Sequence, residues 1–356
     1  MTRHDLSRDD LAALLAGEPA YRVSQLWDGL YRRLRDPGEL TELPVALRLR
    51  LGTVRELLPA LHLAGQSVSD RGGTTKWLFK LADGARIETV LMQYPGRTTV
   101  CVSTQAGCAM ACGFCATGQA GFTRHLTTGE IVEQVIYAAR ASAATGRRMQ
   151  NVVFMGMGEP LANYPRVWAA VQRLNADVGL AARHITISTV GVVPGIRRLA
   201  AEKLQVNLAV SLHAANDSLR DELVPLNRRY PLGVLTEACR QYQAASGRRL
   251  SFEWALIDGV NDRDTDAREL ADIALPLRAH VNLIPLNPTP GYPTRGTPAA
   301  RVRAFAERLH RLSVNATVRQ NRGTDIAAAC GQLAAEAPLV IPGGHALGLG
   351  RRKLQD

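Results

Sequence analysis

The stretch GCAMACGFCATG at residues 107–118 is the most informative part of this chain, because it spaces three cysteines as Cys108, Cys112 and Cys115. Thiolates ligate iron–sulfur clusters, and a [4Fe–4S] cluster normally takes four of them. A compact trio without a clear fourth partner leaves one iron open. The sequence therefore predicts a cluster with a free position for a substrate or cosubstrate.

A zinc site is the alternative use of these three cysteines. Structural zinc takes four sulfur or nitrogen ligands, usually from paired CxxC units, and His125 is the nearby candidate for the fourth. A disulfide framework fits less well, because 356 residues can bury their own core and the start MTRHDLSRDD lacks a secretory signal pattern. With no run of about 18 apolar residues, we expect a soluble, cytoplasmic protein that has no membrane contact.

From residue 100 onward, strand-like apolar segments alternate with helical segments. The strand-like segments are residues 100–104, 151–155, 184–190, 206–212, 252–257, 281–286 and 316–319. This alternation predicts a parallel sheet, in which the loops after the carboxyl ends of the strands carry the active site. The cysteine loop follows the first strand, and Thr127 with Glu130 predicts a capping box for the helix after it. We expect an α/β fold whose core, residues 94–325, is a partial (β/α) barrel.

Three further units flank this core. Residues 1–62 place apolar residues at helical spacing between prolines and glycines, which predicts an N-terminal helical accessory domain. Residues 63–93 contain short alternating segments around an Ala-Asp-Gly turn, which predicts a bridging β-hairpin. Residues 326–356 form a C-terminal segment that contains Cys330.

The charge balance favours a polyanionic partner. Lysine and arginine outnumber aspartate and glutamate by 43 to 32, and all but four of the basic residues are arginine. An aromatic content of 5% argues against a long base-stacking platform. The basic runs at residues 31–35 and 348–353 are candidates for phosphate contacts, although each also fits an ordinary solvated face.

Three cysteines lie outside the loop. Cys239 shares a helical face with Leu235, Ala238 and Tyr242, which indicates a buried structural thiol. Cys101 and Cys330, each taken alone, fit a core residue better than a catalyst.

The chain resembles the radical S-adenosylmethionine RNA methyltransferases of the RlmN/Cfr type, whose superfamily signature is CxxxCxxC. These enzymes methylate an adenine carbon of large-subunit ribosomal RNA. The motifs that carry the resemblance, in the family's order, are CVSTQAGCAMACGFCATG (101–118), NVVFMGMGEPL (151–161), ITISTVGVVPG (185–195), AVSLHAANDSLRDELVPLN (209–227), VNLIPLNP (281–288) and RGTDIAAACGQLA (322–334).

The resemblance implies a [4Fe–4S] cluster held by the three loop cysteines, whose open iron chelates the amino and carboxylate groups of S-adenosylmethionine. The residues implied for the rest of the cosubstrate pocket are Gly158, Glu159, Ser188, Ser211, Leu212, His213 and Asn287. Two molecules of S-adenosylmethionine are consumed per turnover.

The resemblance also implies a mechanism with two more cysteines. Cys330 takes a methyl group from the first S-adenosylmethionine, and a 5′-deoxyadenosyl radical from the second activates that methyl group. The methylene carbon then joins the adenine, and Cys101 releases the protein–RNA crosslink as a Cys101–Cys330 disulfide. Glu88 matches a position proposed as the proton acceptor, although a glutamate in an alternating strand also fits a solvated residue. His125 and His184 fit structural or RNA-facing roles.

We therefore expect methylation of adenosine C2 in 23S rRNA at the peptidyl transferase centre, and of an adenosine in tRNA anticodon loops. Reaching C2 requires unstacking the base, so single-stranded, loop or precursor RNA is the expected substrate. Flavodoxin or ferredoxin is the expected electron donor. Two alternatives stay open: C8-methylation of the same adenosine, as in the antibiotic-resistance branch, and a non-catalytic metal-containing RNA-binding module.

Overall fold

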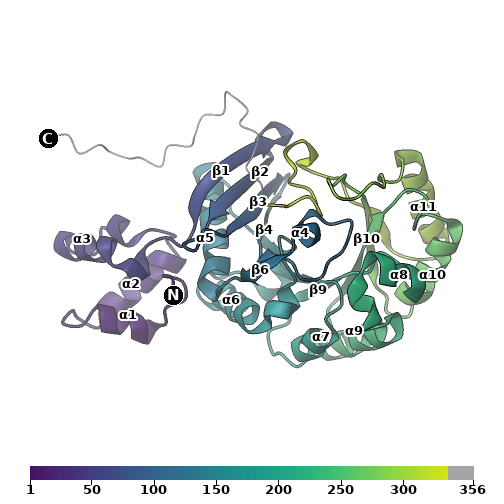
Figure 1. The fold of residues 1–356 in the computed structure, drawn as a ribbon. Helices are drawn as coiled ribbons and strands as arrows, with labels where there is room; N and C mark the ends of the chain where they lie inside the picture. The colour runs from purple at the N-terminus through teal and green to yellow at the C-terminus, as the bar shows by residue number, and fades with distance from the viewer. Residues whose placement is uncertain (336–356) are drawn as a thin grey trace.

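The structure is a computed structural model, and it describes residues 1–335. Its centre is a ten-stranded sheet (Figure 1). In spatial order the strands are β1 (His62–Ser69), β2 (Thr74–Lys80), β3 (Arg86–Tyr94), β4 (Arg97–Cys101), β7 (Asn151–Phe154), β8 (Ile185–Thr189), β9 (Asn207–Ser211), β10 (Leu250–Leu256), β11 (His280–Pro285) and β12 (Ala316–Val318). The first four strands are antiparallel, and every pairing from β4 to β12 is parallel.

The parallel part of the sheet confirms the predicted α/β core. Each of the seven strand-like segments overlaps an observed strand, but the first is displaced: β4 ends at Cys101, whereas residues 100–104 were expected to be extended. Beyond Cys101 the chain leaves the ladder, with the Val102 amide bound to the Val153 carbonyl at 3.0 Å and the Thr104 amide bound to that of Met157 at 2.8 Å. The residues after Cys101 therefore lead away from the sheet and into the cysteine loop.

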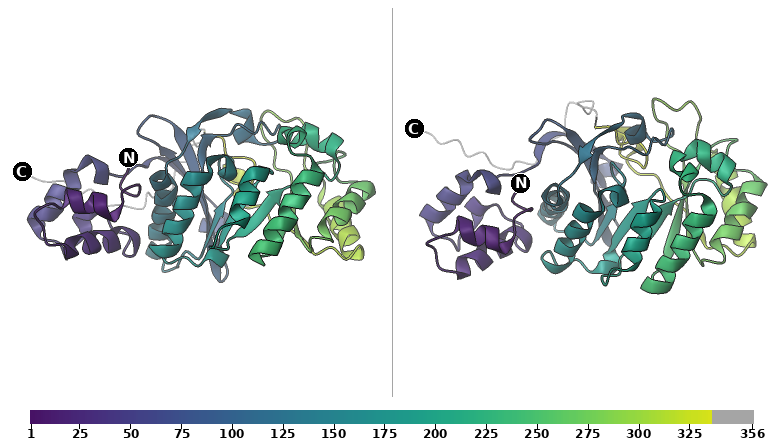
Figure 2. Two further views of the ribbon diagram at one scale, coloured as in Figure 1. Left: turned by 90° about the horizontal axis from the view of Figure 1, so that it is seen from below. Right: turned by 60° about the horizontal axis from the view of Figure 1, so that its bottom comes forward.

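Helices connect the parallel strands and lie side by side over one face of the sheet (Figure 2). They are α5 (Thr128–Ala144), α6 (Tyr164–Ala176), α7 (Val193–Ala200), α8 (Asp217–Leu223), α9 (Leu232–Ser246), α10 (Asp264–Ala274) and α11 (Ala299–Arg311). The predicted capping box is confirmed: the Thr127 side chain accepts from the Glu130 amide, and the Glu130 carboxylate accepts from the Thr127 amide. No helix within residues 1–335 is both long and apolar enough to cross a membrane.

The hairpin expected around the Ala-Asp-Gly turn is confirmed as β2 and β3, which pair antiparallel from Thr74–Met92 to Lys80–Arg86. It extends the central sheet, because β3 also pairs with β4, and β1 adds an outer strand to β2. The antiparallel strands therefore form one wall beside the parallel strands.

Short helices precede the sheet and pack against α5 and α6 (Figure 1). They are α1 (Arg8–Leu14), α2 (Tyr21–Tyr31) and α3 (Val45–Thr53). The buried Arg3 pairs with Glu133 of α5 at 2.9 Å, and Arg173 of α6 donates to the His4 carbonyl at 3.0 Å. Because breaking a buried ion pair costs about 3–5 kcal/mol, these contacts fix the N-terminal helices against the core.

Candidate active site

A cavity of about 210 Å³ opens at the carboxyl ends of the parallel strands. Its wall combines strand ends, the cysteine loop and the C-terminal segment that follows β12. Of the residues predicted from the sequence, those on the wall are Cys101, Cys108, Cys112, Cys115, Gly158, Glu159, Ser188, Ser211, His213, Asn287 and Cys330. The fold thus collects residues from six separate motifs at one edge of the sheet, where α/β folds place ligands.

Leu212 lies behind the wall. Its side chain is fully buried in the core, and it meets its neighbours through its backbone: its amide donates to the Glu253 carbonyl at 3.0 Å, and its carbonyl accepts from Arg220 at 3.1 Å. Leu212 therefore does not line the cavity itself, and its backbone hydrogen bonds hold the neighbouring wall residues Ser211 and His213 in place.

Glu88 also lies off the wall, in a buried ion pair. It is 1% exposed, and its Oε1 atom is 2.7 Å from Lys76 Nζ, so the alternative of a solvated glutamate is wrong. Its Oε2 atom accepts from the amides of Ala334 and Ala335 at 2.9 and 3.2 Å. Both carboxylate oxygens are thus engaged, one of them by the C-terminal segment.

The cysteine loop is compact, and its backbone closes on itself. The Cys108 amide donates to the Gly121 carbonyl at 2.7 Å, and the Cys115 amide donates to that of Cys112 at 3.1 Å. A side chain at Gly118 would place its Cβ atom 2.9 Å from the Cys112 carbonyl oxygen, so only glycine fits there without a shift. The short helix α4 (Ala116–Gln119) begins directly after the last cysteine.

The chemistry of these thiols fits an iron–sulfur cluster. All three cysteines are free thiols that line the cavity. Burial raises the pKa of Cys108 to about 11 and raises that of Cys112 as well, with the neighbouring cysteines adding to the effect at Cys112. Such thiols stay protonated unless a cation stabilises the thiolate. Coordination to iron does so and deprotonates the thiol.

A zinc site with His125 finds no support in the placement of that histidine. His125 is absent from the cavity wall, and its Nδ1 atom is hydrogen-bonded to Gln105 Nε2 at 3.0 Å. His184 likewise lies away from the cavity, with Nδ1 2.9 Å from Asn151 Oδ1, so it has a structural contact.

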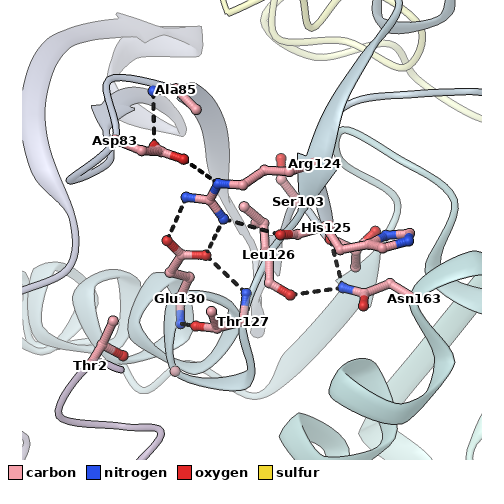
Figure 3. A network of polar contacts seen from close by, with 12 residues as sticks. Thr2, Asp83, Ala85, Ser103, Arg124, His125, Leu126, Thr127, Glu130 and Asn163 are labelled. Carbon is pink, nitrogen blue, oxygen red and sulfur yellow. Dashed lines mark hydrogen bonds and ion pairs between the residues drawn. The ribbon is translucent and has the colours of Figure 1, made fainter.

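A polar network secures the two ends of the cysteine loop (Figure 3). The loop is flanked by a two-stranded sheet of β5 (Gln105–Gly107) and β6 (Phe122–His125). Asn163 donates to the carbonyls of Thr104 and Leu126 at 3.0 and 2.9 Å, so one amide ties the entry of the loop to its exit. Arg124 pairs with Glu130 of α5 at 2.8 Å and with Asp83 of the hairpin turn.

The glycine-rich turn after β7 packs directly against the start of the cysteine loop. A Cβ atom at Gly156 would lie 2.6 Å from the Val102 carbonyl oxygen, and one at Gly158 would lie 2.5 Å from the Gln105 side chain. Gly158 also has a φ of 97°, which disfavours any other residue. The motif therefore has glycines where two backbones meet.

Glu159 follows this turn and is 2% exposed. Its carboxylate accepts from the amides of Leu161 at 3.0 Å and Val190 at 2.9 Å, and its own amide donates to Gln105 Oε1 at 2.8 Å. Burial raises the pKa of Glu159 to about 7, against the lowering effect of these hydrogen bonds. A carboxylate on a cavity wall that titrates near neutral pH is a typical binding-site group.

The opposite side of the cavity is organised by Arg220 of α8, which is 1% exposed. Its guanidinium donates to the Leu212 carbonyl at 3.1 Å and to the Val190 carbonyl at 2.6 Å, so it joins the loops after β8 and β9. His213 has a φ of 61°, and its Nδ1 atom accepts from the Ala255 amide at 3.0 Å. Burial lowers the pKa of His213 to about 3, with Arg220 adding to the effect, so the ring is neutral.

Cys101 and Cys330 meet at the same cavity although they lie far apart in the chain. Burial, and then the Cys330 sulfur, raise the pKa of Cys101 to about 12. Cys330 is exposed at the cavity, where partial loss of water around the thiol raises its pKa and the nearby Arg319 opposes that shift. Arg319 is itself on the cavity wall and pairs with Glu253 at 3.2 Å.

Hydrogen bonds hold the C-terminal segment beside β3 and the cysteine loop (Figure 1). Besides the Glu88 contacts, these are Lys76 Nζ to the Ala327 carbonyl at 3.2 Å, Asn287 Nδ2 to that of Cys330 at 3.0 Å, the Ala116 amide to that of Gly331 at 2.8 Å, and Thr117 Oγ1 to that of Leu333 at 2.5 Å. Residues 326–335 of this segment therefore lie against the cavity, and Cys330 lines it.

Several residues that position the site were missed from the sequence. Gln105 and Arg220 lie inside quoted motifs but look like ordinary polar residues, and their buried hydrogen bonds are the only signal. Arg319 follows the last strand, so its place after a strand end could have pointed to it. Lys76 carries no sequence signal.

Comparisons with known proteins agree with this geometry. A sequence model of the "Radical SAM superfamily" matches residues 102–271. Relatives from Frankia alni and Chloroflexus aurantiacus, each named "Probable dual-specificity RNA methyltransferase RlmN", are 52% and 50% identical to the chain. Each match covers 93% of this chain, together with 82% and 92% of the respective relatives. The crystal structure of a radical SAM methyltransferase from Sphaerobacter thermophilus superposes with a TM-score of 0.91 and 52% identity, covering 94% of this chain and all of that one.

The parallel sheet, the three-cysteine loop and the cavity beside it define a radical SAM enzyme. More closely, the chain belongs to the RlmN family of radical SAM RNA methyltransferases.

Proposed function

We propose that this enzyme methylates C2 of an adenosine in 23S rRNA at the peptidyl transferase centre, and an adenosine in tRNA anticodon loops. The observation that carries the proposal is that Cys101 and Cys330 share one cavity with the three-cysteine loop. Methylation of an unreactive aromatic carbon by this route requires three groups: a thiol that carries the methyl group, a thiol that resolves the crosslink, and a loop that binds the cluster. The dual-specificity name of the relatives supports both RNA classes.

In this proposal Cys108, Cys112 and Cys115 hold a [4Fe–4S] cluster, which supplies the electron that cleaves S-adenosylmethionine. The remaining contacts to the cosubstrate come from the cavity wall. Gly158 and Glu159 receive the methionyl part, with the Glu159 carboxylate accepting from the amino group. The other proposed contacts are Ser188, Ser211, His213 and Asn287, with Leu212 contributing through its backbone.

Cys330 is the proposed methyl carrier. Its thiolate attacks the methyl group of one S-adenosylmethionine, and the guanidinium of Arg319 favours that thiolate. The 5′-deoxyadenosyl radical would take a hydrogen atom from the S-methyl group, and the resulting carbon radical would add to adenine C2. The adduct would then return one electron to the oxidised cluster and lose its C2 proton to a base. The Cys101 thiolate attacks the Cys330 sulfur, the electron pair of the broken S–CH2 bond passes to the methylene carbon, which takes up a proton and becomes the methyl group, and a disulfide remains between the two cysteines.

We propose Glu88 as the base that removes the hydrogen at the substituted carbon. It accepts hydrogen bonds from Ala334 and Ala335, so the end of the described segment must withdraw before its carboxylate can reach the RNA. Glu88 lies on the same strand as Val90 and Met92, which line the cavity. Side chains alternate along a strand, so Glu88 shares the face of β3 that carries Val90 and Met92.

The proposal also includes the RNA-binding region, the electron donor and the cellular compartment. The N-terminal helices contribute to RNA binding, flavodoxin or ferredoxin supplies the electron, and the enzyme works in the cytoplasm. In the basic run 31–35, Arg33 pairs with Glu42, and Arg32 lies 3.7 Å from Asp28, so the charge of that run is partly neutralised. The run at 348–353 lies outside the described residues.

The regiochemistry is tested by product analysis. We expect the protein, reconstituted anaerobically with iron, sulfide, S-adenosylmethionine and reductant, to convert unmodified large-subunit RNA to a product that digests to 2-methyladenosine. Mass spectrometry against 2- and 8-methyladenosine standards is the measurement. Finding 8-methyladenosine alone would assign the enzyme to the C8 alternative. Finding neither, while S-adenosylmethionine is cleaved, would remove RNA as the substrate.

Glu159 gives the expected pH dependence of cosubstrate binding. Its carboxylate accepts hydrogen bonds with both oxygens only when ionised, because protonation turns one oxygen into a donor, and burial raises its pKa in the folded protein to about 7. We therefore expect the affinity for S-adenosylmethionine to weaken as pH falls below about 7, approaching tenfold per pH unit for a one-proton dependence. Glu159→Gln should bind more weakly and with a flatter pH profile. Equilibrium binding to the reconstituted protein measures this, and Glu237→Gln, on the exposed face of α9, is the control.

A further inference from the structure

An arginine cluster surrounds Tyr94 at the end of β3. The Arg97 and Arg322 guanidiniums lie over the Tyr94 ring, 4.5 and 4.4 Å from its centre, and Arg147 donates to the Tyr94 carbonyl at 3.1 Å. Tyr94 and Arg322 are on the wall of the active-site cavity, and Arg97 is exposed beside them. Three cations from separate parts of the chain therefore gather at one side of the cavity entrance.

The cluster lacks counter-charges. Over the part of the chain that the structure describes, no carboxylate lies within 4.0 Å of Arg97, Arg147 or Arg322, whereas Arg33 and Arg124 have acidic partners. Like charges gathered around one side chain repel one another, and a bound anion would offset that repulsion. The arrangement is therefore suited to a ligand that brings negative charge.

The geometry favours phosphate over a nucleobase. A guanidinium over a tyrosine ring is held in place by cation–π attraction, and its remaining N–H groups can still donate to a ligand. The two guanidiniums also occupy the space over the ring where a base would stack. Arginine forks match phosphate oxygens, which accept two parallel hydrogen bonds.

We propose that Arg97 and Arg322, held on Tyr94, bind the phosphodiester backbone of the RNA strand next to the adenosine being methylated. This inference rests on the proposed function, and it names the residues that hold the substrate. Phosphate contacts set the register of a strand without reading its sequence. Bound here, the backbone lies at the cavity entrance, where an unstacked base can turn towards Cys330.

Arg322 also links this site to the catalytic segment. It donates to the Gln93 carbonyl at 3.2 Å, and the preceding residue, Asn321, donates to Asn287 Oδ1 at 2.7 Å. Asn287 in turn donates to the Cys330 carbonyl. Arg322 is therefore tied into the fold. The Arg97 side chain lies over the Tyr94 ring and makes no hydrogen bond or ion pair with the described residues, which makes Arg97 the cleaner test.

The test compares Arg97→Gln with Arg303→Gln, an exposed arginine on α11 that has no acidic partner within 4.0 Å among the described residues. Binding of an unmodified large-subunit RNA transcript to the reconstituted full chain is measured by fluorescence anisotropy over a range of salt concentrations. We expect Arg97→Gln to lower the slope of log affinity against log salt by about 0.7 to 1, the loss of one phosphate contact. Arg303→Gln should match the wild type, and Arg97→Lys should restore most of the slope.

Two further readouts separate this inference from the proposed function. Methylation of Cys330 in the absence of RNA should be the same in wild type and Arg97→Gln, while the KM for RNA rises and kcat is retained. Equal salt slopes for Arg97→Gln and Arg303→Gln, with RNA methylation by the wild type intact, would overturn the phosphate site alone. A wild type that methylates Cys330 but no RNA would overturn the proposed function and this inference together.

Discussion

Replacing Cys101 with alanine is expected to trap a covalent complex between protein and RNA, and replacing Cys330 is expected to abolish that complex and the methylated product together. Both thiols line the cavity, and in the proposed mechanism the Cys101 sulfur attacks the Cys330 sulfur. Without Cys101 the methylene bridge to the RNA has no resolving thiol. Without Cys330 the bridge cannot form.

Denaturing gel electrophoresis with radiolabelled RNA measures the adduct, and mass spectrometry locates it on the peptide that contains residue 330. Cys239→Ala is the matched control, because Cys239 is fully buried on α9 with Leu235, Ala238 and Tyr242, as the helical pattern predicted. That variant should methylate RNA without accumulating an adduct. If the Cys101 variant turns over at the wild-type rate, or cleaves S-adenosylmethionine without any crosslink, the two-thiol mechanism is wrong.

The parallel core could be predicted from the sequence because its strands are short strand-like segments that alternate with helical segments. Residues 281–286 and 316–319 form uninterrupted strand-like segments, and β11 and β12 occupy 280–285 and 316–318. Residues 100–104 look equally strand-like, yet the chain turns away after Cys101. The cause is tertiary: the backbone beyond Cys101 bonds to the turn after β7, at residues 153–157, and no local pattern encodes that contact.

Glu88 shows where prediction from a pattern ends. A glutamate in a strand beside apolar residues suggests one solvated face, but β3 is buried on both faces through most of its length. One face is covered by the C-terminal segment, whose Ala334 amide contacts Glu88 from 246 residues away along the chain. The same reasoning applies to Arg220, which on α8 resembles a surface charge and is instead buried against the carbonyls of Val190 and Leu212.

The cysteines of the loop could be identified from spacing alone, whereas their surroundings required the fold. Spacing places three thiols within eight residues, and the resemblance assigns them to a cluster. The ties that hold the loop come from elsewhere: Asn163 precedes α6, and Arg124 reaches back to the hairpin turn at Asp83. The spacing of the cysteines therefore predicts the cluster ligands, but it does not predict the tertiary contacts that hold the cysteine loop in place.

Cys112→Ala is expected to remove the iron–sulfur cluster and all cleavage of S-adenosylmethionine, while the fold is retained. Cys112 is 6% exposed, and burial raises the pKa of its thiol, so the folded chain holds it protonated until a cation binds. Two thiolates cannot replace three as protein ligands of a cluster that already lacks a fourth. The same loss is expected for alanine at Cys108 and Cys115.

Iron and sulfide content, the visible charge-transfer absorption of the reconstituted protein and formation of 5′-deoxyadenosine measure this loss. Cys239→Ala again supplies the control, since it removes an equally buried thiol from a helix that does not line the cavity. Circular dichroism separates loss of the cluster from unfolding. A Cys112 variant that keeps a stable cluster would remove this residue as a ligand. If the wild type bound zinc stoichiometrically and no iron, the non-catalytic alternative would replace the enzyme, because the radical on which methylation at C2 depends could not then be made.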